Sequence, residues 1–246
     1  MCGRIALYTP PARLARYFDA ELAEGVDRDD QPTWNVGPTT LIDGVTLRRR
    51  PDEEPKRVLR LYRWGLVPSW AKDPSGGSRL FNARAETIAT KPSFRAAFEK
   101  HRGLIPADGF YEWRKVPGRG RQPHFFQRAD GDPMAFAGLF AFWRDERRPE
   151  DDPEAWIRSC TIVTTTAGPD MDGIHDRMPV VLDPEVFDVW LDPDGDQHEL
   201  RGLLRPPPRG TLRHHRVDPK VGNVRNDTPD VLAEYAAPSG RSDTLF

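Results

Sequence analysis

The chain has 246 residues, with 36 lysines and arginines against 38 aspartates and glutamates and a formal net charge of −2. This balance excludes an overall basic surface, so any nucleic-acid site has to be a local cluster of cations. No apolar run approaches the roughly 20 residues that a membrane span needs, and no signal-peptide pattern opens the chain, so no membrane partner is expected. Two cysteines, Cys2 and Cys160, exclude a disulfide framework and favour a reducing cytoplasm.

The first third of the chain predicts several short elements. Residues 4–9 alternate as a short strand does. Residues 10–22 predict a helix, because they begin with proline and place Leu14, Tyr17, Phe18 and Leu22 at helical spacing. Further predictions are a turn leading into a strand at 33–42, a strand at 57–68 and a loop at 73–79.

The rest of the chain favours strands with a few helical turns. Two apolar, β-rich runs suit a sheet interior, and the charged, proline-containing segment 144–156 between them predicts a surface loop. The other predictions are a short helix at 92–101, two strands around a turn at 102–116, those runs at 133–143 and 159–167, and a helix start at 183–191. Without repeats or a long linker, this favours one α+β domain with a curved, mostly antiparallel sheet, over residues 1–235, and a tail at 236–246.

No metal or cofactor site is expected. The six histidines lack HExxH spacing, and no CxxC pair is present. The glycine-rich stretch at 75–79 lacks the lysine of a phosphate-binding loop, so a flexible hairpin loop is the favoured interpretation.

Cys2 is the first candidate for chemistry. Methionine before a small residue is normally trimmed, which leaves an α-amine and a thiol on one residue. The amine titrates near 8 and the thiol near 8.5, so both are partly nucleophilic at neutral pH. Such a 1,2-aminothiol condenses with an aldehyde to a Schiff base, and the thiol then closes a thiazolidine ring. A cysteine without function beside the start codon is an equally open alternative.

Three more clusters carry candidate residues. In an extended LFNARAET segment, Asn82, Arg84 and Glu86 share one face, as a ligand site or as a solvated face with an Arg–Glu pair. Glu112 lies beside Trp113, so the carboxylate is placed for proton transfer and the indole for base stacking, unless this is an amphipathic edge strand.

His175 and Arg177 stand two residues apart, so an extended segment places both on one side. Histidine suits acid–base catalysis near neutral pH, although a structural histidine is the usual alternative. Cys160 lies in an apolar run and is expected to be a core thiol.

Taken together, these segments resemble a known family. MCGR, WNVGP, WGLVPSW, FNARAET, PADGFYEW, GIHDRMPVVL and VGNVRND, in this order, are similar to the motifs of the SOS-response-associated peptidase (SRAP) family. The resemblance implies a barrel-like curved sheet and recognition of abasic sites in single-stranded DNA. It further implies a reversible thiazolidine crosslink between the N-terminal cysteine and the open sugar aldehyde. The peptidase label reflects a proposed thiol autoproteolysis, here removing Met1, that exposes the cysteine.

The resemblance also implies residue roles. Cys2 matches the nucleophile, Asn82 the residue that positions the cysteine and the sugar, Glu112 the acid–base carboxylate and His175 the histidine at the sugar hydroxyl. The residues that match DNA contacts are Arg4, Arg84 and Arg177 for phosphates, Trp70 and Trp113 for bases, Pro38 at the rim and Thr164 through its backbone.

Two other functions are open from the residues alone. A thiol hydrolase of peptide or amide bonds would use Cys2 with His175 or its own amine, although only Met1 precedes Cys2 as a propeptide. A non-catalytic single-strand binder would explain the arginines and tryptophans but not the aminothiol. In either DNA-binding case the expected state is a cytoplasmic, nucleoid-associated monomer, and the acidic segment 144–156 would weaken binding if it bordered the DNA channel.

Overall fold

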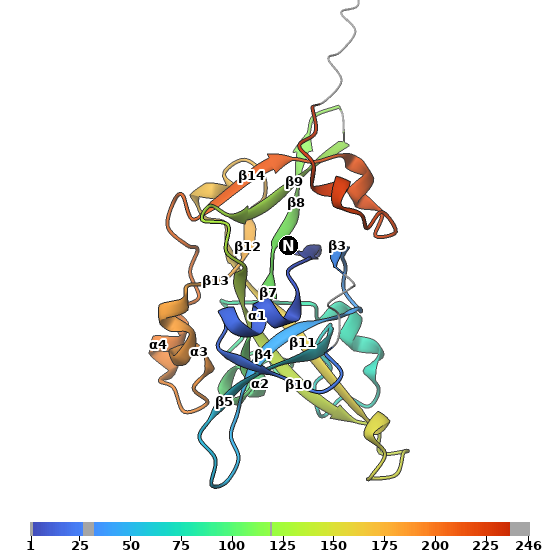
Figure 1. Cartoon of the computed structure of the whole chain (residues 1–246), viewed down its shortest axis with the longest axis vertical. Helices are drawn as coiled ribbons and strands as arrows, with labels where there is room; N and C mark the ends of the chain where they lie inside the picture. Colours follow the sequence, from blue (N-terminus) through green and yellow to red (C-terminus); the bar gives the residue numbers. More distant parts are fainter. Residues whose placement is uncertain (1, 27–31, 119, 237–246) are drawn as a thin grey trace, which may run out of the picture.

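A five-stranded barrel forms the lower part of the molecule in Figure 1. The computed structural model describes residues 2–26, 32–118 and 120–236. Neighbouring barrel strands are antiparallel, except for the parallel pair β5 and β11 that closes the circle. The strands, in barrel order, are β4 (Leu41–Arg48), β5 (Lys56–Trp64), β11 (Trp156–Thr166), β10 (Met134–Arg144) and β7 (Arg102–Ala107).

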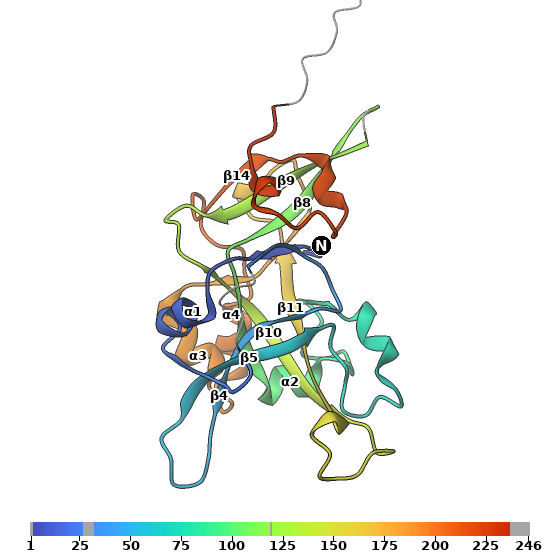
Figure 2. The ribbon, with the colours of Figure 1, turned by 45° about the vertical axis from the view of Figure 1, so that its right-hand side comes forward.

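A second sheet lies across one end of the barrel, and the N-terminal end of the chain lies between the two (Figures 1 and 2). All of its strand pairs are antiparallel. The strands run in the order β14 (Leu212–Arg216), β9 (Gly120–Arg128), β8 (Gly109–Val116), β1 (Ile5–Leu7) and β3 (Thr33–Val36).

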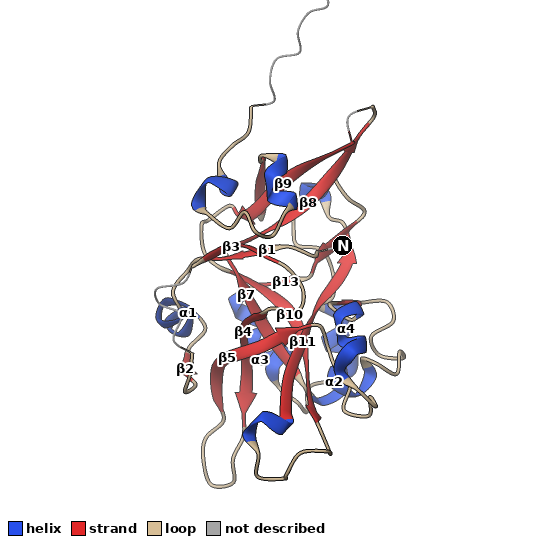
Figure 3. Ribbon diagram, turned by 90° about the vertical axis from the view of Figure 1, so that its right-hand side faces the viewer, coloured by secondary structure: helices blue, strands red, loops and turns tan. Residues whose placement is uncertain are grey.

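The two sheets are joined by a corner between β7 and β8. Asp108 stands at this corner, and its carboxylate accepts the backbone amides of Tyr8 and Thr9, at 2.6 and 2.8 Å. Because Tyr8 and Thr9 follow β1 directly, the carboxylate fixes the end of β1 against the corner. This arrangement holds the N-terminal residues above the barrel (Figure 3).

Short strands extend the barrel at its edges. They are β2 (Ala20–Leu22) on β5, β6 (Asn82–Arg84) and β12 (Arg177–Pro179) on β11, and β13 (Val181–Leu182) on β10. β6 pairs with β11 in parallel and β12 pairs with it antiparallel. The FNARAET and GIHDRMPVVL motifs therefore both pair with the same strand, β11. Two sequence motifs that are about 90 residues apart are thereby brought together.

The helices are short and cover the barrel. They are α1 (Pro11–Tyr17), α2 (Arg95–Lys100), α3 (Phe187–Leu191) and α4 (Gln197–Gly202), with α3 and α4 side by side on one flank (Figure 1). Phe94 and Phe98 at α2 are both buried, so one face of this short helix packs into the core. Among the described residues no helix is long and apolar enough to cross a membrane.

The α+β, single-domain fold with a curved, barrel-like sheet and short helices is confirmed, and five details of the local predictions were wrong. The helix predicted at 10–22 ends at Tyr17, because Asp19 turns with a φ of 48° and the next residues pair with the edge of β5. The predicted turn at 33–42 contains strand β3, and the strand predicted at 57–68 ends at Trp64. A 3₁₀-helix (Pro74–Arg79) replaces the predicted loop and hairpin, and another (Pro184–Val186) precedes α3.

Two apolar clusters meet at the barrel wall. One fills the space between the barrel and its helices, and the other lies between the barrel and the second sheet and contains Cys2 and Cys160. Cys160 is fully buried, as predicted for a core thiol. Within the predicted tail, residues 237–246 lie outside the described residues.

Candidate functional site

Cys2 is buried between the second sheet and the barrel. The side chain has no exposed surface and packs in the same cluster as Trp64 and Phe110. Its backbone oxygen accepts a 2.7 Å hydrogen bond from Nδ2 of Asn82. Burial, and then the charge of Glu112, raise the pKa of the Cys2 thiol well above its ordinary value, so the sulfur is protonated at neutral pH.

Glu112 and His175 face each other beside Cys2. Glu112 lies on β8 and is 3 % exposed, and its Oε2 is 3.9 Å from Nε2 of His175. Nδ1 of His175 accepts the backbone amide of Arg177 at 3.0 Å, and this bond leaves the proton of a neutral ring on Nε2, toward Glu112. In a doubly protonated ring, Nδ1 instead pairs with Asp176 Oδ1, 2.9 Å away. The surroundings of His175 therefore provide hydrogen-bond partners for both the neutral and the doubly protonated ring.

Asn82 and Arg84 lie on β6 at the mouth of an open groove. They line a groove of about 570 Å³ together with Lys91 and Phe94. The amide nitrogen of Asn82 is bonded to Cys2, and its buried Oδ1 has no hydrogen bond to a described residue. Arg84 is exposed and makes no ion pair within the described chain. The groove therefore presents the two cations Arg84 and Lys91 to a ligand, next to the residue that holds Cys2.

Glu86 pairs with Arg177 rather than with Arg84. The two side chains form a bidentate ion pair, with N–O distances of 2.7 and 3.0 Å, and the bonds to Arg177 lower the pKa of Glu86. Arg177 also donates to the backbone oxygen of Thr164 at 2.6 Å. The side chain of Thr164 is fully buried. In this structure Thr164 therefore positions Arg177, and its predicted backbone contact with DNA stays a prediction.

Arg4 is held by the protein itself. Its guanidinium donates to Oδ1 of Asn35 and to the backbone oxygen of Val221, both at 2.7 Å, and lies 5.8 Å from the ring centre of Trp113. Burial lowers the pKa of Arg4. Ala6 and Tyr111 belong to a different apolar cluster from the one that contains Cys2. The predicted phosphate contact of Arg4 therefore competes with internal hydrogen bonds.

The remaining predicted residues lie at different places. Pro38 is half-buried in the turn before β4, and this turn is hydrogen-bonded to Trp64, which packs in the same cluster as Cys2. Trp113 is also half-buried, whereas Trp70 is 65 % exposed in a loop after β5 and lines a different pocket, with His101 and Phe142. Cys2, Asn82, Glu112 and His175 thus come together, and the structure does not bring Trp70 to them.

Two buried polar residues were missed by the sequence reasoning. Asn35 donates to three backbone oxygens of the segment 221–226 and is 2 % exposed. His124 on β9 is the cross-strand neighbour of Glu112, is 4 % exposed, and lies with its Nδ1 3.2 Å from that of His214. The only signal for Asn35 was the WNVGP motif, and His124 carried none, because its role depends on strand register.

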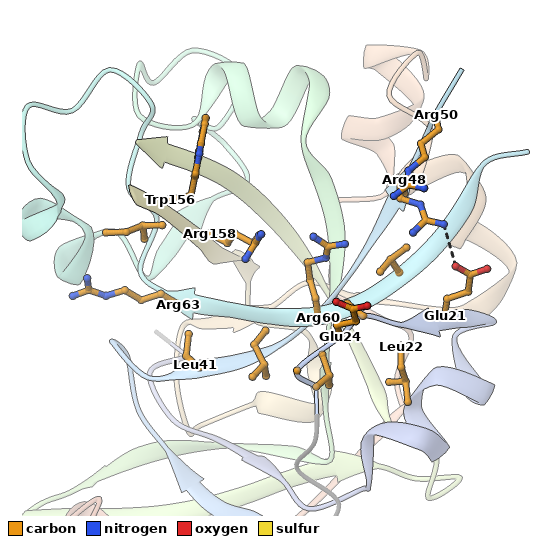
Figure 4. A pocket seen from close by; sticks show the side chains of 16 residues that line it. Glu21, Leu22, Glu24, Leu41, Arg48, Arg50, Arg60, Arg63, Trp156 and Arg158 are labelled. Atoms are coloured by element: carbon orange, nitrogen blue, oxygen red, sulfur yellow. Dashed lines mark hydrogen bonds and ion pairs between the residues drawn. The ribbon is translucent and has the colours of Figure 1, made fainter. Parts of the chain in front are cut away.

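Another groove lies on the wall formed by β4, β5 and the start of β11 (Figure 4). It measures about 850 Å³ and is lined by five arginines, among them Arg60 and Arg158, and by Glu21, which pairs with Arg48. None of the predicted site residues lines it. In the described ranges, no group of three or more His, Cys, Asp or Glu could hold a metal ion.

The charged loop 144–156 lies at the end of the barrel far from the second sheet and the N-terminal end (Figures 1 and 3). Two of its arginines pair with acids of the loop itself: Arg147 with Asp145, and Arg148 with Asp152 and Glu154, at 2.8 and 3.1 Å. The loop is exposed, as predicted, and it does not border the groove that contains Asn82 and Arg84.

Comparisons with known proteins identify the family of the chain. Residues 1–224 match the family model described as SOS response associated peptidase (SRAP). The chain is 36% identical over 238 residues to the abasic site processing protein YoqW of Bacillus subtilis, covering 96% of this chain and all of that protein. It is 33% identical over 270 residues to the abasic site processing protein HMCES of Gallus gallus, covering 94% of this chain and 77% of that protein.

A solved structure from Bacteroides thetaiotaomicron shares the fold. It has a TM-score of 0.81 at 23% identity and covers 96% of this chain and 100% of that chain. The barrel with its second sheet is therefore the architecture of a known fold.

Proposed function

Because the chain belongs to the SOS response associated peptidase family, we propose that it senses abasic sites in single-stranded DNA and holds them in a covalent thiazolidine crosslink through Cys2. The observation that supports this most is the pairing of buried Glu112 with half-buried His175 beside a buried Cys2. The proposed state is a monomer in the cytoplasm, bound to the nucleoid when it is on DNA.

The proposed reaction has two steps. Once Met1 is removed, the α-amine of Cys2 attacks the aldehyde of the ring-opened sugar and forms a Schiff base, with loss of one water. The thiol then adds to the same carbon, and its proton passes to the nitrogen to close the ring. Because the thiol pKa is raised, the sulfur needs a base at this step, and Glu112, whose carboxylate acts on the thiol, is the proposed base.

The proton transfers before ring formation need an acid and a base together. An abasic sugar is mostly a closed hemiacetal, so opening it takes a proton from the hydroxyl and gives one to the ring oxygen. Glu112 and His175, 3.9 Å apart, are the proposed pair, and Asn82 is proposed to orient Cys2 and the sugar. With no base at the lesion, little stacking energy is lost on entry to the site.

The DNA strand is proposed to pass over the groove of Asn82 and Arg84. Arg84 and Arg177 are the proposed phosphate ligands, with Arg4 as a third if it exchanges its internal bonds for a phosphate. Trp70 and Trp113 are proposed to contact bases, with Pro38 at the rim and Thr164 supporting Arg177.

Self-cleavage is the second candidate function. A thiol autopeptidase at Cys2 would remove Met1, and the family description names peptidase activity. The intact mass of purified protein should lack Met1, and a Cys2→Ala variant tests whether removal depends on the thiol. Active protein that retains Met1 would contradict the crosslinking mechanism, because the amine would be blocked.

The crosslink is tested with single-stranded DNA that carries one abasic site. The wild type should give an adduct that survives denaturation without a reductant, whereas Cys2→Ser, which keeps the amine, should give one only after borohydride trapping. Cys160→Ala is the matched control and should retain the full yield. No wild-type adduct, or an equal reductant-free yield from Cys2→Ala, would refute the proposal.

A further inference from the structure

A second cationic pocket lies on the second sheet, next to Glu112. It measures about 460 Å³, a usual size for a small-molecule site, and opens between the β8–β9 hairpin and the segment after β14. Its cations are Arg114, Lys115, Arg121 and Arg216, and no acidic residue lines it. None of the four makes an ion pair with a residue that the structure describes, so their charge is available to a ligand.

His124 lines the same pocket, and its pKa reflects the positive charge around it. Burial, together with the charges of His214, Arg216 and Arg114, lowers the pKa of His124 to about 4. Its Nε2 is buried and has no hydrogen bond to any described residue. A buried ring nitrogen without a hydrogen-bond partner, next to cations without counter-ions, is the arrangement expected of an anion-binding site.

Strand register ties the pocket to the reaction centre. Glu112, His124 and Arg216 are direct neighbours across β8, β9 and β14, so their side chains share one face of the sheet. Arg114 is two residues beyond Glu112 on the same face, about 7 Å along the strand. Successive phosphates of an extended single strand are farther apart than the rise of about 3.4 Å per nucleotide in duplex DNA, so the pocket is about one nucleotide from the sugar at Glu112.

Tyr235 supplies an apolar wall. It lines the pocket, is half-buried, and is fixed by a 2.8 Å bond from its amide to the backbone oxygen of Arg216. A flat aromatic ring beside arginines is the combination that stacks a base while the cations hold its phosphate.

We propose that this pocket binds a nucleotide that flanks the abasic site in the same single strand, with its phosphate on Arg114 and Arg216 and its base against Tyr235. The inference rests on the proposed function for the identity of the ligand, single-stranded DNA. It adds a subsite that reads the neighbouring nucleotide and fixes the direction in which the strand leaves the reaction centre.

The test measures binding of undamaged single strands, so it does not depend on the crosslink. Arg114→Gln with Arg216→Gln is compared with Arg201→Gln with Arg205→Gln, two exposed arginines at and after α4 that make no ion pair within the described chain. Both doubles change the net charge equally. The pocket double should reduce the slope of log K against log salt by about 0.7 for each lost phosphate contact, and the control should not.

Tyr235 is tested by a matched pair of substitutions. Tyr235→Ala should weaken binding by about tenfold, whereas Tyr235→Phe should keep the wild-type affinity, because stacking needs only the ring. Equal slopes for the two arginine doubles, or equal affinities for the alanine and phenylalanine variants, would overturn the subsite.

A crosslinking arm separates this inference from the proposed function. An abasic sugar that carries a 5′ and a 3′ phosphate is extended by nucleotides on the 5′ or the 3′ side, and affinity is taken from the DNA concentration dependence of crosslinking. The pocket double should lose the affinity gained by extension on one side only, whereas the Arg201→Gln with Arg205→Gln control should keep the gain on both sides. A failure of the wild type to crosslink would count against the proposed function and leave the binding result standing. No difference on either extended side would count against the subsite.

Discussion

At the scale of single residues, Glu112 and Cys2 are coupled through charge. The carboxylate of Glu112 raises the pKa of the Cys2 thiol, second only to burial. Glu112→Gln removes that charge and keeps the shape, so we expect the thiol pKa to fall. The pH dependence of thiol alkylation, in a Cys160→Ala background where Cys2 is the sole cysteine, measures it. A thiol pKa that is unchanged or higher would contradict the coupling.

The same variant separates the two roles of Glu112. If the carboxylate acts only on the thiol, Glu112→Gln should form the crosslink faster at neutral pH, because more thiolate is present. If it carries the proton transfers, crosslink formation and reversal should both slow by about 10²- to 10⁴-fold. We expect the slower rates, measured by denaturing gel over time, since ring opening precedes attack by the sulfur.

At the scale of elements, Asn35 ties β3 to the segment 221–226. Asn35→Ala leaves one buried and two partly buried carbonyls without their donor and Arg4 without one acceptor, so we expect a loss of about 2–4 kcal/mol in the free energy of unfolding. Urea unfolding measures this loss. Asn223→Ala, the same change at an exposed side chain, should lower the free energy of unfolding far less. An equal loss in both variants would show that the hydrogen bonds of Asn35 add no particular stability.

The sheet of β8, β9 and β14 should lose stability in mild acid. The pKa of His124 is about 4 in the folded chain and near 6.5 unfolded, so the unfolded chain binds more protons between these values. Stability from this group is complete above pH 6.5 and falls with pH through that window, by about 2 kcal/mol between pH 7 and pH 5. Urea unfolding at both pH values should show a smaller difference for His124→Asn, and the same difference in both proteins would refute this assignment.

Local sequence patterns predicted the positions of helices and strands better than they predicted which strands pair with each other. The apolar runs of β10 and β11 and the pair of strands around Asp108 follow from composition and turn residues. The end of α1 at Tyr17 does not, because the edge of β5 competes for residues 20–22. The site follows the same rule: Cys2, Asn82, Glu112 and His175 were found from their chemistry and the family motifs, whereas the pairing of Glu86 with Arg177 depends on two strands meeting on β11.

At the scale of the whole molecule, the positive and negative charges nearly balance but are separated in space. The acidic loop 144–156 lies at one end of the barrel (Figure 1), while unpaired cations gather on the β8–β9 hairpin and around β6. The barrel thus serves as a support, and the second sheet closes over Cys2 (Figure 2). A net charge of −2 gives little long-range attraction to DNA, so affinity has to come from the few arginines that reach phosphates.

This distribution predicts how salt acts on binding. Arg84 is exposed in the groove beside Asn82, so Arg84→Gln should lower the slope of log K against log salt by about 0.7 for a single strand. Arg95→Gln, at an exposed arginine on α2, changes the net charge by the same amount and should leave the slope unchanged. Fluorescence anisotropy at salt concentrations from about 50 to about 200 mM compares the slopes of the two variants. Because both variants alter the overall field equally, a difference between them can arise only from a phosphate contact at Arg84, and equal slopes would remove Arg84 from the DNA path.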